Sequence, residues 1–129
     1  MPSIDVARRY IQAVQAGDHA TLGALISPHI VWHQPGHHRF SGTHRGVQAV
    51  MQMLGGMMEV SQGTFRITRV HRFMANDPWV TIELEFEGRR DDALVAQPGI
   101  DLVRIEDGQI AEVRLFSSDP AQEDAFWGT

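Results

Sequence analysis

The stretch GIDLVRIEDGQIAEVRLF, residues 99–116, decides the fold, because its pattern predicts two strands joined by a tight turn. Apolar and polar residues alternate on both sides of the central Asp-Gly pair (107–108), which is a strong signal for a β-hairpin. The alternation places Asp101 on the strand face that carries Val103 and Ile105. A carboxyl group on an apolar face makes Asp101 the most informative residue of the chain.

Two registers of this hairpin are open. A two-residue turn sets Asp101 opposite Arg114, whereas a three-residue loop with a left-handed Gly108 sets Asp101 opposite Val113. We favour the three-residue loop, because it keeps Arg114 outside the apolar face. Asp101 then lies in apolar surroundings without a facing cation, so its pKa should rise and its protonated carboxyl can donate a hydrogen bond. The alternative is an aspartate bonded to backbone or water.

The rest of the chain predicts helices followed by strands. Amphipathic or apolar patterns indicate helices over 3–16, over a short segment capped by Asp18 and stopped by Pro28, and from Val47 to Met58, with a short strand over 30–34. β-rich segments follow at 64–74, 79–87, 94–106 and 109–117, and the tail from 120 resembles a last helical turn. This order predicts an α+β fold, with a mostly antiparallel sheet folded over the N-terminal helices.

The composition fits one globular domain. The chain has 129 residues, so we expect a single domain over 1–129. No stretch approaches the roughly 18 apolar residues of a spanning helix, and the start lacks a signal-peptide pattern, so we expect no membrane association and a cytoplasmic protein. The net charge of −5, without a basic run, argues against nucleic acid as a partner. The absence of cysteine excludes disulfides and cysteine-ligated zinc.

Two more residues suit acid/base chemistry in an apolar pocket. Tyr10 lies on the inward stripe of the first helix, where its phenol can donate one hydrogen bond. His33 lies on the short strand, and its ordinary pKa suits a base at neutral pH. A purely structural role is the alternative for each. The seven histidines invite a metal site, but no HExxH or paired-ligand helix is present, so we expect no metal.

Four segments resemble a known family. The segments RYIQAVQAGD, FSGT, EFEGRR and GIDLVRIEDG, in this order and spacing, resemble ketosteroid isomerase, within the superfamily of SnoaL-like polyketide cyclases and nuclear transport factor 2-like proteins. The resemblance spans nearly the whole chain. It implies a cone-like α+β barrel, in which a curved, mostly antiparallel sheet wraps around the N-terminal helices and encloses one apolar pocket.

The resemblance also implies roles for three residues. Tyr10 falls on the oxyanion-hole tyrosine and Asp101 on the protonated acid that assists it, a group for which ketosteroid isomerase is the usual example. Counting back without a gap from the segment 41–43, His33 falls on the catalytic base. The isomerase has an aspartate there, so the resemblance implies proton abstraction next to a carbonyl more firmly than it implies a steroid substrate.

We therefore predict an isomerase or cyclase without a cofactor, acting on a small hydrophobic, carbonyl-containing molecule that is steroid- or polyketide-like. The alternatives are a non-catalytic ligand-binding or dimerisation module, and water activation as in epoxide hydrolases, which needs a buried arginine beside Asp101. An exposed sheet face predicts a homodimer. The pocket is expected to be lined by Trp32, Met51, Leu54, Met58, Phe86, Val103 and Val113.

Overall fold

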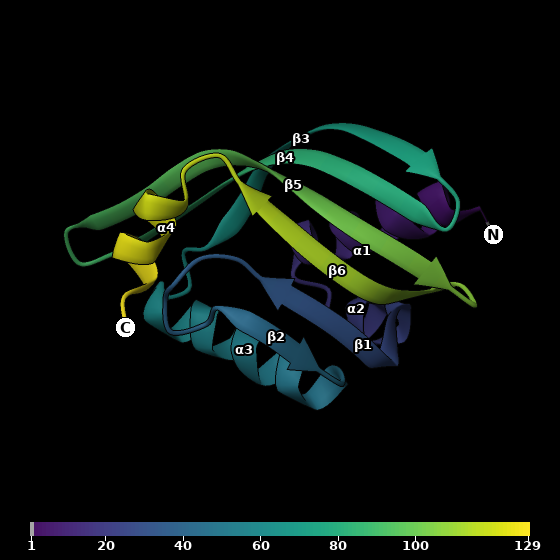
Figure 1. Ribbon diagram of the computed structural model, residues 1–129, viewed down its shortest axis with the longest axis horizontal. Coiled ribbons are helices and arrows are strands. Elements are labelled where there is room, and N and C mark those ends of the chain that lie inside the picture. Colours follow the sequence, from purple (N-terminus) through teal and green to yellow (C-terminus); the bar gives the residue numbers. More distant parts are fainter. Residues whose placement is uncertain (1) are drawn as a thin grey trace.

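One curved sheet with helices against its concave side forms the computed structural model, which describes residues 2–129 (Figure 1). The expected α+β fold is therefore confirmed. In chain order, the elements are α1 (Ser3–Ala16), α2 (His19–Leu25), β1 (Ile26–Gln34), β2 (Gly42–Arg45), α3 (Val47–Val60), β3 (Arg66–Asn76), β4 (Trp79–Arg90), β5 (Ala93–Glu106), β6 (Gln109–Ser117) and α4 (Pro120–Trp127).

The strands follow the order β2-β1-β6-β5-β4-β3. All neighbours are antiparallel except β1 and β6, which run parallel. The two edge strands, β2 and β3, do not pair with each other, so the curved sheet is open and the cone-like α+β architecture does not close into a complete barrel. No helix within residues 2–129 combines the length and the apolar character needed to cross a membrane.

The helical half of the chain follows the sequence signals closely, with two differences. Gly17 ends α1 in a left-handed conformation, and the Asp18 carboxylate accepts the Thr21 N–H at the start of α2. The second helix ends at Leu25, before the proline expected to stop it, so Ile26 begins β1. β2 lies between the expected strand over 30–34 and the expected helix from Val47, where no strand was predicted.

Strand β4 has one apolar and one charged face. Its apolar residues Val80, Ile82, Leu84 and Phe86 are buried on the concave face. Its glutamates lie on the convex face, where Glu83 and Glu87 form ion pairs with arginines of β3. The concave side of the sheet is therefore the apolar core, and a polar group on that side is removed from bulk water.

The β5–β6 hairpin differs from both registers considered for it. Its turn has two residues, Asp107 and Gly108, with φ of 52° and 75°. The pairing then shifts by one residue, and Asp101 lies opposite Leu115. The expected three-residue loop, with Asp101 opposite Val113, is therefore wrong, although Gly108 is left-handed as predicted.

A β-bulge keeps Arg114 outside the apolar face, which is the effect that the three-residue loop was expected to have. Ala111 is the extra residue of β6, and the bulge lets Ile110, Ala111 and Val113 all be buried. Arg114 stays on the convex face, where 49% of its side chain is exposed. The apolar face is thus completed without an arginine beside Asp101.

Replacing Gly108 tests this turn. Gly108→Val should lower the free energy of unfolding by about 1–3 kcal/mol, because a β-branched residue is strained at positive φ. A Cβ at Gly108 would meet no atom within 4 Å, so the loss comes from the backbone alone. Gly108→Asn is the matched control and should lose much less, since asparagine tolerates this conformation. Urea unfolding measures both; a Val variant as stable as the Asn variant would contradict the left-handed turn.

Candidate active site

Tyr10 and Asp101 meet on the concave side of the sheet. Tyr10 points inward from α1 and is 3% exposed. Asp101 lies on the concave face of β5 between Ile82 of β4 and Leu115 of β6, and it is only partly exposed. The negative charge of Asp101 helps burial to raise the pKa of the Tyr10 phenol, which shows that the two groups lie close together.

Burial governs the protonation of Asp101. It raises the pKa of this carboxyl from 3.8 to about 7, and the negative charge of Glu123 adds to the effect. The carboxyl of Asp101 therefore titrates close to neutral pH, so its protonated form is available there. Tyr10 keeps its proton throughout the physiological range. The pair can thus present two O–H donors in one place.

His33 does not join this pair, and the prediction that it serves there as the base is wrong. Along β1 the inward residues are Ile30, Trp32 and Gln34, so strand alternation turns His33 to the convex face. Its Nε2 lies 2.8 Å from Glu112 Oε2, and its Nδ1 lies 3.2 Å from Thr43 Oγ1. The sheet backbone separates the imidazole from Asp101.

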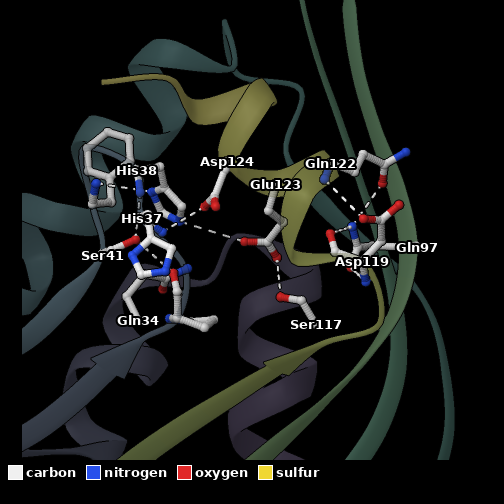
Figure 2. A network of polar contacts seen from close by, with 12 residues as sticks. Gln34, His37, His38, Ser41, Gln97, Ser117, Asp119, Gln122, Glu123 and Asp124 are labelled. Carbon is white, nitrogen blue, oxygen red and sulfur yellow. Dashed lines mark hydrogen bonds and ion pairs between the residues drawn. The ribbon is translucent and has the colours of Figure 1, made fainter.

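A second carboxyl group, Glu123 of α4, acts on Asp101 instead, because its negative charge raises the pKa of that residue. Figure 2 shows the contacts of Glu123. Its side chain is 7% exposed. The Ser117 hydroxyl donates a 2.8 Å hydrogen bond to Glu123 Oε1, and Glu123 Oε2 lies 3.8 Å from His38 Nε2. Burial raises the pKa of Glu123, and the negative charge of Asp124 raises it further. The hydrogen bond from Ser117 and the nearby indole N–H of Trp127 lower this pKa in part.

Several contacts hold α4 in this position. The buried Gln97 side chain of β5 donates to the Asp119 carbonyl at 2.9 Å and accepts the Asp119 N–H at 2.9 Å. The Asp119 carboxylate caps α4 by accepting the Gln122 N–H. At the other side, the Asp124 carboxylate accepts the His37 N–H at 2.8 Å. These contacts, most of which Figure 2 shows, fix Glu123 between β5 and the loop after β1.

His38 is a neutral donor in this cluster. Its side chain is fully buried, and burial lowers its pKa. His38 Nδ1 accepts the Phe40 N–H at 3.1 Å, which leaves the ring proton on Nε2. Neither this N–H nor the buried indole N–H of Trp127 has a hydrogen-bond partner among residues 2–129. The side chains of His38 and Trp127 both lie near the Glu123 carboxylate.

The predicted lining residues divide into two groups. Trp32, Phe86, Val103 and Val113 are buried in the core, and Met51 and Leu54 are partly buried against it. Met58 is 43% exposed and cannot line the interior, because α3 turns Met53 and Met57 inward instead.

Two surface hollows, of about 370 and 330 Å³, lie away from the concave site, and neither is lined by Tyr10 or Asp101. In the described part of the chain, no three histidine or carboxylate side chains gather as metal ligands would.

Residues 7–113 match the model of the SnoaL-like domain. The chain belongs to this family. A solved protein of unknown function with a cystatin-like fold, from Xanthomonas campestris, is 60% identical, covers 100% of both chains and has a TM-score of 0.97. An uncharacterised protein of Mycobacterium tuberculosis is 29% identical over 96% of this chain and 95% of its own. A candidate polyketide cyclase from Sinorhizobium meliloti, 18% identical over 89% of this chain and 94% of its own, shares the fold with a TM-score of 0.70.

Sequence reasoning missed Glu123 and His38 as site residues of this SnoaL-like domain. For Glu123 a signal was present, because it shares one helical face with Phe126 and Trp127, which are both buried as expected. A carboxylate on an apolar helix face is as informative as Asp101 on an apolar strand face. His38 carried no such signal, since only the fold of the loop after β1 buries it.

Exchanging Asp101 for asparagine should change how stability depends on pH. Between the pKa of 3.8 expected in the unfolded chain and that of about 7 in the folded one, the folded state holds a proton that the unfolded state has lost. The contribution of Asp101 to the free energy of unfolding is therefore fully present below about pH 4. This contribution is lost as the pH rises to about 7, by at most ~1.4 kcal/mol per pH unit.

Urea unfolding of the wild type and Asp101→Asn between pH 4 and 8 measures this contribution. The wild type should lose stability relative to the variant over the range. A constant difference between the two proteins would show that the carboxyl has an ordinary pKa in the folded state.

Proposed function

We propose that this SnoaL-like domain is an isomerase or cyclase that needs no cofactor and moves a proton next to the carbonyl of a small hydrophobic, steroid- or polyketide-like molecule. The observation that supports this is the pairing of Tyr10 with a partly exposed Asp101 whose pKa is about 7. Two O–H donors in an apolar setting suit an oxygen that gains negative charge during a reaction.

The chemistry follows from where charge develops. When a base removes a proton from the carbon next to a carbonyl, the C–H electron pair moves into the C–C bond and the carbonyl becomes an enolate. Tyr10 and protonated Asp101 would donate to that oxygen, and one such preorganised donor is worth about 10²–10³ in rate. Return of the proton to another carbon completes an isomerisation. Attack of the enolate carbon on a second carbonyl, whose oxygen takes the proton, completes a cyclisation.

The structure weakens the water-activation alternative. That chemistry requires a buried arginine beside Asp101, and the cross-strand neighbours of Asp101 are Ile82 and Leu115. Arg114 is paired with Leu102 and lies on the convex face. A binding module without turnover is separated from an enzyme by the experiment below.

Two Asp101 variants test the donor role. Binding of 2-naphthol, a phenol that mimics an enolate, should fall only a few-fold in Asp101→Asn, which keeps a donor. It should fall about 10- to 100-fold in Asp101→Leu, which removes the donor while keeping an apolar side chain of similar size. Fluorescence titration measures the binding. Deuterium exchange next to the carbonyl of indan-2-one, followed by NMR, measures proton abstraction.

His33→Gln is the control from the opposite face of the sheet and should leave both measurements unchanged. Small, equal losses of binding in both Asp101 variants would mean that Asp101 is only structural. An Asn variant as weak as the Leu variant would mean that the ionised carboxylate is the working form. Tight binding of 2-naphthol by a wild type that never exchanges the ketone would identify a binding module.

A further inference from the structure

Proton abstraction needs a base on the concave side, where His33 is absent. The buried ionisable groups around the site are Tyr10 from α1, His38 from the loop after β1, Asp101 from β5 and Glu123 from α4. Tyr10 holds its proton too firmly to be a base, and the proton of His38 lies on the nitrogen that faces Glu123. Asp101 is needed as a donor under the proposed function. Glu123 is the carboxylate that remains.

Burial raises the pKa of Glu123, and hydrogen-bond donors around its carboxylate oppose this effect. Ser117 donates to Oε1, and the N–H groups of His38 and Trp127 lie near the same carboxylate without a partner of their own. A buried N–H without an acceptor is costly, so a negative charge on Glu123 makes the placement of these donors favourable. The 3.8 Å between Glu123 Oε2 and His38 Nε2 leaves this oxygen without a hydrogen bond from the ring.

Asp101 has the opposite environment. Its strand neighbours on the concave face are apolar, and no hydrogen-bond donor contacts its carboxylate among the side-chain bonds described above. A negative charge on Glu123 raises the pKa of Asp101, so an ionised Glu123 and a protonated Asp101 support each other. Burial raises the pKa of both carboxyl groups, but only Glu123 has hydrogen-bond donors that oppose this effect. Two carboxyl groups in such unequal environments are typical of an acid and a base that work together.

Given the proposed function, on which this step rests, we propose that Glu123 is the proton acceptor of this site. His38 is then a positioning residue for the Glu123 carboxylate. The Glu123 carboxylate takes the proton from the carbon next to the carbonyl, so a C–H bond breaks and an O–H bond forms. The electron pair moves to the oxygen held by Tyr10 and Asp101. Glu123 returns the same proton to the product, and no other reactant is required.

The loop after β1 keeps His38 in place. The backbone N–H of His38 donates to Ser41 Oγ at 2.9 Å, and the Ser41 hydroxyl donates to the Pro35 carbonyl at 2.8 Å. The imidazole packs against the rings of Phe40 and Trp127, with centroid distances of 6.2 Å to each. The ring therefore stays beside the Glu123 carboxylate, with Nε2 3.8 Å from Oε2, while the proton is transferred.

Glu123→Gln tests the proposal, with Glu59→Gln on the exposed side of α3 as the matched control. The control should behave as the wild type. Glu123→Gln should slow the exchange of indan-2-one by about 10²–10⁴-fold, the usual contribution of a positioned base. Binding of 2-naphthol should stay within a few-fold, because Tyr10 and Asp101 are intact. NMR titration of the Asp101 carboxyl should give a pKa lower than the wild-type value of about 7, since a negative neighbour has been removed.

The pH profile gives a readout that does not depend on the glutamine variant. Exchange by the wild type should need an ionised Glu123 and a protonated Asp101, so its rate should fall on both the acid and the alkaline side, the latter near pH 7. Asp124 and Tyr10 are the other titratable groups facing this pair, with the Asp124 charge acting on Glu123. His38→Phe should move the acid limb to higher pH by removing an N–H donor, and His38→Gln should restore it in part.

The outcomes separate the two proposals. If the wild type binds 2-naphthol and exchanges indan-2-one while Glu123→Gln exchanges at the wild-type rate, Glu123 is not the base and the proposed function stands. If the wild type neither binds nor exchanges, the proposed function fails and this inference fails with it. If the glutamine variant does not fold, Glu123→Asp keeps the charge on a shorter side chain and should show an intermediate loss. A wild-type profile without an acid limb would overturn the role of Glu123.

Discussion

Two carboxyl groups removed from water on the same side of a curved sheet cannot both be charged without a large cost, and this constraint governs the electrostatics of the concave side. Asp101 and Glu123 come from β5 and α4, and each is removed from water by the apolar core. Donors gather around Glu123 alone. The surroundings of Glu123 therefore offset part of the effect of burial, whereas those of Asp101 do not.

The curvature of the sheet and the β-bulge at Ala111 together create this constraint. The sheet bends around α1 and α3 without closing, which leaves a concave side for the core and for the two carboxyl groups (Figure 1). The bulge at Ala111 keeps the apolar residues of β6 on that side and Arg114 on the other. Without the bulge, an arginine would neutralise Asp101 and lower its pKa.

The two faces of the sheet carry different electrostatics. On the convex face, Glu112 contacts His33 at 2.8 Å and Arg104 at 3.4 Å, and its pKa is lowered because hydrogen bonds and positive charge outweigh its burial. Such half-exposed ion pairs contribute little stability in water. On the concave face, unpaired carboxyl groups have raised pKa values. Carboxyl groups thus form ion pairs on the convex face, whereas those on the concave face have pKa values suited to proton transfer.

The sequence by itself determined the helices, the strands of the second half and the unusual position of Asp101, because each of these depends on a local period of apolar residues. It also placed Tyr10 inward. It could not decide the side of His33, since an ungapped count along the chain ignores which face of β1 packs on the core, and Trp32 takes the inward position. Only the tertiary structure decided the bulge at Ala111 and the meeting of Glu123 with Asp101, because both depend on contacts between elements that are separate in the sequence.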